Sequence, residues 1–185
     1  MTDLEMAVKH NDVKAVEELL RCGADCNTKD GSGRDMLCVA VMQGFTEIMR
    51  LLIDDGAKVN APDQSGMTPL MTAACYGQAG AVRVLLDCGA EINAKSLNNQ
   101  WTALMFATVP LEADACELLL ERGADASICG KHGETAEMIA RSKRRPQMVR
   151  LLQKHWGAQC HDLALKNQQQ LKSKARPRIL KSPAA

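Results

Sequence analysis

The sequence predicts an all-α solenoid, in which helix-turn-helix units stack side by side and β-turn loops join them. A Gly-Ala pair recurs along the chain at intervals of 33, 33, 34 and 34 residues. A pair of large aliphatic residues stands at a constant distance before the first four Gly-Ala pairs. Aromatic residues make up only 3% of the chain and hydrophobic residues 46%, so the core must consist of small and aliphatic side chains. The Gly-Ala pairs begin at Gly23, Gly56, Gly89, Gly123 and Gly157.

The stretch from Asp63 to Ala94 shows the unit most clearly. Thr68 is a good helix N-cap, and Pro69 suits the first helical position because it has no amide hydrogen to leave unsatisfied. Gly77 can adopt the left-handed conformation that ends this helix, and Gly89 ends a second one. No single unit can bury the apolar faces of its two helices, so copies must stack. Those faces consist of Leu70, Ala73 and Ala74 in the first helix and Val82, Leu85 and Leu86 in the second.

This order of residues resembles an ankyrin repeat, a unit of about 33 residues with a β-turn and two antiparallel helices. The resemblance covers residues 1–158 and implies a protein-binding role without catalysis. The histidine that usually follows Thr-Pro-Leu in the family is absent, which implies that a hydrogen-bond network between repeats is missing. In the second repeat, Asp30 and Gly33 frame the turn. The predicted repeats are 1–29, 30–62, 63–95, 96–129 and 130–158.

The terminal repeats and the fourth repeat depart from the pattern. The first repeat starts at its first helix, capped by Thr2 or Asp3, and is predicted to be an N-terminal cap. In the fourth repeat Leu111 follows Pro110 in place of the helix-ending glycine, which predicts an irregular turn. The fifth repeat has a basic helix turn, and Trp156 is predicted to cover the end of the core. The polar outward side chains expected in the first repeat are Glu5, Lys9, Lys14, Glu17, Glu18 and Arg21.

Residues 159–185 differ from the repeats in charge. They contain six Lys or Arg residues against Asp162 alone, a net charge of +5, so the repeats carry −4 of the chain's total of +1. The charge, the prolines and the scarcity of bulky side chains predict a basic, mostly disordered tail. Four roles are open for the tail: a nuclear import signal over 172–181, a docking motif over 178–180, a phosphorylation site at Ser182, or a solubilising segment.

The eight cysteines do not form a disulfide framework by their spacing, so we interpret them as reduced thiols. Cys22 and Cys26 have the spacing of half a zinc site, but no second pair follows, and no metal is expected. Thiol reactivity is expected mainly at Cys160, Cys26 and Cys75. Reduced thiols, the lack of a signal peptide and the lack of a long apolar run predict a cytoplasmic or nuclear protein without a membrane span.

No nucleotide-binding or nucleophile motif occurs in the chain, and its histidines are scattered. We therefore expect no enzymatic activity, no cofactor and no small-molecule substrate. The leading hypothesis is a monomeric adaptor or scaffold that binds a protein partner. One alternative is a stoichiometric inhibitor of a kinase, a transcription factor or another enzyme. A second is binding of nucleic acid or a nuclear import factor through the tail, against which the negative charge of the repeats argues.

In the architecture that the resemblance implies, the turn tips and the exposed side of the first helices line a concave groove. Aromatic residues and Arg often dominate the energy of interfaces, and Met makes adaptable contacts. The alternative is that Trp101 folds back on its own turn and Tyr76 covers a repeat junction. For Asn60 and Asn93 the resemblance allows hydroxylation, and we favour hydrogen bonds to loop backbone. The candidate groove residues are Arg34, Met42, Gln43, Met67, Tyr76, Asn99, Trp101, Lys131 and His132.

Overall fold

The computed structural model describes residues 2–111 and 113–155, and within this part the predicted all-α solenoid is confirmed. The predicted tail and Trp156 lie outside the described residues. The first helices of the repeats are α1 (Asp3–Lys9), α3 (Met36–Gln43), α5 (Pro69–Cys75), α7 (Ala103–Phe106) and α9 (Ala136–Ser142). The second helices are α2 (Val13–Arg21), α4 (Thr46–Asp54), α6 (Ala79–Asp87) and α8 (Asp114–Glu121), followed by helical residues 146–155.

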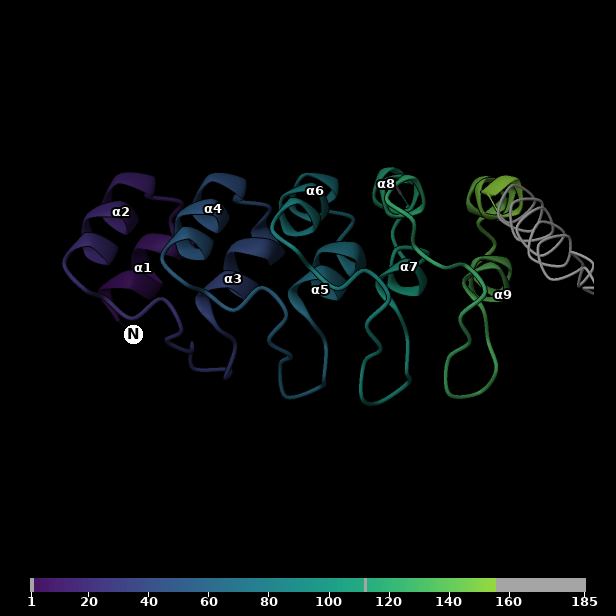
Figure 1. Ribbon diagram of the computed structural model, residues 1–185, viewed down its shortest axis with the longest axis horizontal. Helices are drawn as coiled ribbons and strands as arrows, with labels where there is room; N and C mark the ends of the chain where they lie inside the picture. Colours follow the sequence, from purple (N-terminus) through teal and green to yellow (C-terminus); the bar gives the residue numbers. More distant parts are fainter. Residues whose placement is uncertain (1, 112, 156–185) are drawn as a thin grey trace, which may run out of the picture.

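The helices form two rows, with the turn loops projecting beyond the row of first helices (Figure 1). The first helices α1, α3, α5 and α7 each pack against the second helix of their own repeat and against the first helix of the next, as α5 does against α6 and α7. In the part of the chain that the structure describes, extended pairing is limited to an isolated antiparallel bridge between Lys29 and Asp35. The loops therefore act as turns, and the helices supply the core.

Side-chain caps fix where the first helices begin. The Thr68 hydroxyl accepts a hydrogen bond from the backbone N–H of Met71 at 3.4 Å, and the Asp35 carboxylate accepts one from Cys38 at 2.7 Å. These bonds satisfy amide groups that have no partner within the first turn of a helix. Thr2 and Thr135 make the corresponding bonds in the first and fifth repeats.

The fourth repeat has the shortest first helix, and this helix ends where the missing glycine predicts an irregular turn. Helices α3 and α5 are followed by Gly44 and Gly77 in the left-handed conformation, with φ of 73° and 67°. Leu111 stands at this position after α7, and α7 has only four residues. A turn at Ala107 and Thr108 and a bend over 109–111 then lead out of the helix, so the predicted irregularity is present.

One apolar core runs through all the repeats. Leu52, Leu85 and Leu119 occupy the same place in successive second helices, and none of them is accessible to solvent. Met71 and Met105, at the position of the family's histidine, are also buried. Aliphatic and sulfur-containing side chains thus fill the space between repeats, as the low aromatic content predicts.

The prediction that Glu5 belongs to the polar outer face is wrong. Glu5 is only 4% exposed, and its carboxylate lies 2.6 Å from the Lys9 ammonium. The hydrogen bond and positive charge of Lys9 lower the pKa of Glu5. Glu5 takes the register position that Cys38 and Met71 occupy in the next two repeats, and this position is buried in each of them.

Two asparagines join the loops of successive repeats. The Asn60 side chain accepts a hydrogen bond from Glu91 N–H at 2.9 Å and donates one to the Gly89 carbonyl at 3.2 Å. Asn93 accepts one from Asp125 N–H at 3.0 Å. The interpretation that these asparagines hydrogen-bond loop backbone is confirmed, and the bonds reach the following repeat.

Candidate functional site

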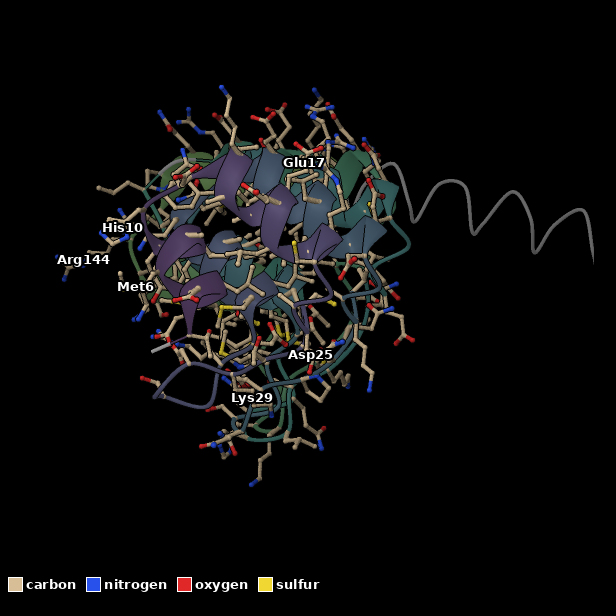
Figure 2. The ribbon with its side chains drawn as sticks, turned by 90° about the vertical axis from the view of Figure 1, so that its left-hand side faces the viewer. Met6, His10, Glu17, Asp25, Lys29 and Arg144 are labelled. Atoms are coloured by element: carbon tan, nitrogen blue, oxygen red, sulfur yellow. The ribbon has the colours of Figure 1, made fainter. Side chains whose placement is uncertain are left out.

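The turn loops and the C-terminal ends of the first helices contribute to one surface, which we call the turn face. Figure 2 views the stack from its N-terminal end, with His10 and Arg144 at one side and Lys29 among the turns below. The Arg34 guanidinium lies 3.3 Å from the Met42 sulfur, which joins the turn of the second repeat to the end of α3. The candidate residues on the turn face are Arg34, Met42, Gln43, Met67, Tyr76, Asn99, Trp101, Lys131 and His132.

Asp30 holds Arg34 in place. Its buried carboxylate accepts hydrogen bonds from the backbone N–H groups of Ser32 and Arg34 and from two guanidinium nitrogens of Arg34, at 2.7–3.0 Å. Burial by itself would raise the pKa of Asp30, but these hydrogen bonds and the positive charge of Arg34 lower it. Arg34 therefore presents a fixed, half-exposed cation beside Met42.

Tyr76 is the most prominent aromatic side chain of the turn face. It follows α5 directly, is 53% exposed, and its phenol O–H makes no hydrogen bond within the described part of the chain. Gln43 is exposed at the end of α3, one repeat earlier. The Gln78 amide donates to the Met42 carbonyl at 3.4 Å, which ties the end of α3 to the third repeat.

Trp101 makes a contact that neither sequence-based alternative included. Its indole N–H donates to the Glu134 carboxylate at 2.6 Å, so it joins the turns of the fourth and fifth repeats. The hydrogen bond from Trp101 is the main reason that the pKa of Glu134 is lowered. The Trp101 ring also packs edge-on against Phe106, with centroids 5.3 Å apart. Trp101 is half-buried, and the one hydrogen-bond donor of its side chain is already used.

The turn of the fifth repeat depends on a glycine. Gly130 stands where Asp30 frames the turn of the second repeat, and a Cβ there would lie 2.9 Å from the Trp101 ring. In the second repeat Asp30 accepts a hydrogen bond from Ser32 N–H. In the fifth repeat Glu134 accepts the corresponding hydrogen bond, from His132 N–H at 2.8 Å. The Lys131 N–H donates to the Asn99 carbonyl at 2.8 Å, and the Lys131 and His132 side chains are exposed.

The predicted site residues therefore fall into two groups. Gln43, Tyr76, Lys131 and His132 present exposed side chains. The half-buried residues are Arg34, Met42, Met67, Asn99 and Trp101. Asn99 serves its own turn, because its side-chain oxygen accepts hydrogen bonds from the Ser96 hydroxyl and from Trp101 N–H.

Two exposed leucines of the fourth repeat were missed as site candidates. Leu97 is 74% exposed and Leu111 is 72% exposed. Leu97 lies in the turn that carries one extra residue, and a Cβ at Gly66 would come within 2.4 Å of it. The insertion and the missing glycine were the signals in the sequence that could have identified these two side chains.

The cysteines differ from their expected accessibility. Cys26 is buried and burial raises its pKa, so the expectation of a reactive Cys26 is wrong. Cys75 is half-buried, and burial raises its pKa as well. Cys22 and Cys129 are the exposed thiols of the described residues, and Cys160 lies outside them. No group of three or more potential metal ligands occurs in the described ranges.

Stacked helix pairs joined by turn loops define a helical repeat solenoid. A family model described as ankyrin repeats, in three copies, matches residues 4–96, half of the chain, and the chain belongs to this family. A search of curated proteins gave no match. Ankyrin repeats generally mediate protein–protein interaction and are typically non-catalytic. None of the helices described here has the length and apolar character that crossing a membrane requires.

Proposed function

We propose that the chain is a non-catalytic adaptor or scaffold whose turn face binds a protein partner. The exposed Tyr76 carries this proposal, because it is a large aromatic side chain with no hydrogen-bond partner in the described structure. Arg34 and Met42 lie one repeat away as a preorganised pair. Exposed aromatic residues and fixed arginines are the types that most often dominate interface energy. The free cysteines support a reducing compartment, the cytoplasm or the nucleus.

Binding by purified variants tests this proposal. Affinity capture with the full chain identifies a partner, and titration of that purified partner then compares the wild type with Tyr76→Ala. Loss of a central aromatic contact should weaken binding by ~2 kcal/mol or more, about 30-fold in Kd. Trp101→Ala is a poor probe, because it also breaks the bond to Glu134 that joins two turns.

Arg83→Ala and Glu47→Ala are the matched controls, because both side chains are exposed on second helices. Circular dichroism must show an unchanged fold for each variant. Unchanged binding by a Tyr76→Ala/His132→Ala double variant would exclude the turn face. If the captured partner is an enzyme, loss of its activity on addition of the chain would favour the inhibitor over the adaptor.

A further inference from the structure

The N-terminal end of the stack leaves uncovered an apolar position that every other repeat buries. Met6 stands four residues after the helix N-cap and is 45% exposed. The residues at the same position in the other repeats are only 5–8% exposed. They are Val39, Thr72, Phe106 and Ile139. Met6 therefore occupies a position that contacts a neighbouring repeat elsewhere in the array, and no described repeat covers it.

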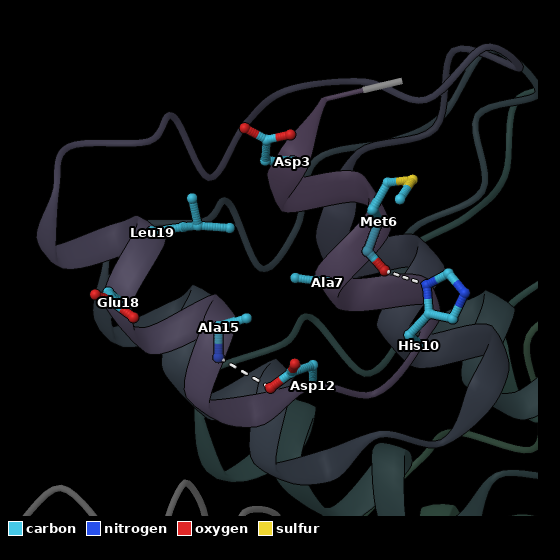
Figure 3. Close-up of a pocket in the computed structure, with 8 residues that line it drawn as sticks. All are labelled: Asp3, Met6, Ala7, His10, Asp12, Ala15, Glu18 and Leu19. Carbon is cyan, nitrogen blue, oxygen red and sulfur yellow. Dashed lines mark hydrogen bonds between the residues drawn. The ribbon is translucent and has the colours of Figure 1, made fainter.

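Helix α2 adds two further positions of this kind. Leu19 is half-buried, whereas Leu52, Leu85 and Leu119 at the same distance before their Gly-Ala pairs are inaccessible. Ala15 is half-buried, although its counterparts in α4, α6 and α8 are buried. These side chains line an open hollow of about 510 Å³ between α1 and α2 (Figure 3).

Carboxylates surround this hollow. Asp3, Asp12 and Glu18 line it, and no Lys or Arg does. Asp3 and Glu18 are exposed at positions where the inner repeats carry apolar side chains. We call this surface the N-terminal end face: Met6, Ala15 and Leu19, with Asp3, Asp12 and Glu18.

The opposite end of the described stack has uncovered apolar positions of its own. Met138 is 55% exposed, whereas the residues at its position in the other repeats are only 1–4% exposed. They are Glu5, Cys38, Met71 and Met105. Val149 is half-buried, although its counterparts in the other second helices are inaccessible.

Arginines surround this second surface. Val149 shares an open groove of about 730 Å³ with Arg141, Arg144, Arg145 and Arg150, and no carboxylate lines the groove. The Arg145 guanidinium donates to the Val109 carbonyl at 3.2 Å, which fixes it against the fourth repeat. Within the described part of the chain, Arg141 alone of these arginines has an ion pair, with Glu137. We call this surface the C-terminal end face: Met138 and Val149, with Arg141, Arg144, Arg145 and Arg150.

We propose that copies of this chain associate end to end, with the N-terminal end face of one copy seated on the C-terminal end face of the next. Each face exposes the positions that a neighbouring repeat covers within the array. The two faces also carry opposite charge, three carboxylates against four guanidinium groups. A second copy is the occupant that supplies both a stacking partner for these exposed positions and the complementary charge.

This contact joins two different faces, so it does not close on itself as a two-fold dimer does. It produces dimers and short linear oligomers. The proposed association differs from the sequence-based expectation of a monomer, and it leaves the turn face of each copy free for a partner. Because the charges lie at exposed rims, added salt weakens the contact.

Sedimentation equilibrium of the full chain measures the association, with a reductant present to keep Cys22 and Cys129 as thiols. The average mass should rise above the monomer's 20.1 kDa with protein concentration in ~0.01 M salt. It should return toward the monomer mass in ~1 M salt, where the Debye length has fallen from ~30 Å to ~3 Å. A monomer mass at ~1 mM protein in low salt overturns the proposal.

Charge reversal identifies the faces. Glu18→Arg and Arg150→Glu should each weaken self-association about tenfold, since each places like charges in contact. An equimolar mixture of the two variants should associate again, because the altered faces then complement each other. Glu47→Arg, which changes charge to the same extent on α4, should associate as the wild type does.

Three results contradict end-to-end stacking. The first is a mixture of the two variants that stays monomeric although the wild type associates. The second is unchanged self-association of Glu18→Arg. The third is loss of association on deletion of residues 159–185, which would transfer the contact to the basic tail.

Discussion

Asp30 organises a turn with a single carboxylate. Hydrogen bonds from two backbone N–H groups and from the Arg34 guanidinium converge on a side chain that is only 2% exposed. A buried carboxylate would be costly without such partners, and the charged bonds offset its desolvation. The turn therefore depends on the negative charge of Asp30, and so does the position of Arg34 on the turn face.

Stability should accordingly depend on pH through Asp30. The pKa of Asp30 in the folded chain is lowered below the unfolded value of about 3.9. The stabilisation that ionised Asp30 gives to the folded state is therefore fully present above that pH. The contribution is lost as the pH falls through the folded pKa. Asp30→Asn should lower the free energy of unfolding by ~1–3 kcal/mol at pH 7 and flatten its dependence on pH below about 5.

Urea denaturation between pH 3 and pH 7 measures this effect. A control substitution on the surface should change the free energy of unfolding by no more than ~0.5 kcal/mol. Asp54→Asn is that control, since its carboxylate is exposed and has no ion pair within the described residues. An Asp30→Asn curve parallel to the wild type would show that Asp30 titrates alike in both states.

At the scale of the helix, the position after each first helix decides how the chain turns back. Gly44 and Gly77 adopt positive φ there at no steric expense. Asn11 takes the same conformation in the first repeat, as its tolerance of the left-handed region predicts. Arg144 does so in the fifth repeat, with φ of 55°, although a long side chain gives no such tolerance.

Arg144→Gly should therefore stabilise the fifth repeat. A non-glycine residue in the left-handed region costs about 1–2 kcal/mol, and glycine loses ~0.5–1 kcal/mol through its freedom in the unfolded chain. We expect a net gain of ~0.5–1 kcal/mol, seen as a higher midpoint in thermal unfolding. Lys143→Gly, at φ of −83°, has no strain to relieve and should destabilise.

The sequence predicts elements of this fold better than it predicts contacts of the site. The helix starts at Thr68 and Thr135 and the irregular end of α7 follow from local chemistry, so they could be predicted. The bond from Trp101 to Glu134 joins residues 33 apart and depends on side-chain conformation, which periodicity does not encode. The burial of Glu5 was missed for a related reason, since a polar residue took a position that faces the core.

At the scale of the whole molecule, stability is shared between neighbours in a line. Each repeat contacts the repeats beside it, so a central position supports two junctions and a terminal position only one. Met6 and Met138 show this difference between terminal and central repeats, because both are exposed whereas their counterparts in the inner repeats are buried. The same difference leaves the two end faces available to a second copy.

A comparison of Leu85→Ala with Leu19→Ala tests whether a central position contributes more to stability than a terminal one. Both leucines stand four residues before a Gly-Ala pair, but Leu85 is inaccessible in α6 and Leu19 is half-buried in α2. Leu85→Ala should lower the free energy of unfolding by ~2–5 kcal/mol, because it leaves a cavity in the core. Leu19→Ala should lower it by less than about 2 kcal/mol, since solvent already reaches that side chain.

Urea denaturation at low protein concentration and high salt isolates this effect from any association of the ends. A central cavity also weakens the coupling between the two halves of the array. The Leu85→Ala transition should therefore broaden, with a lower m-value, as the halves begin to unfold separately. Equal losses of stability for the two variants would mean that the array unfolds as one cooperative block whose ends are as tightly held as its centre.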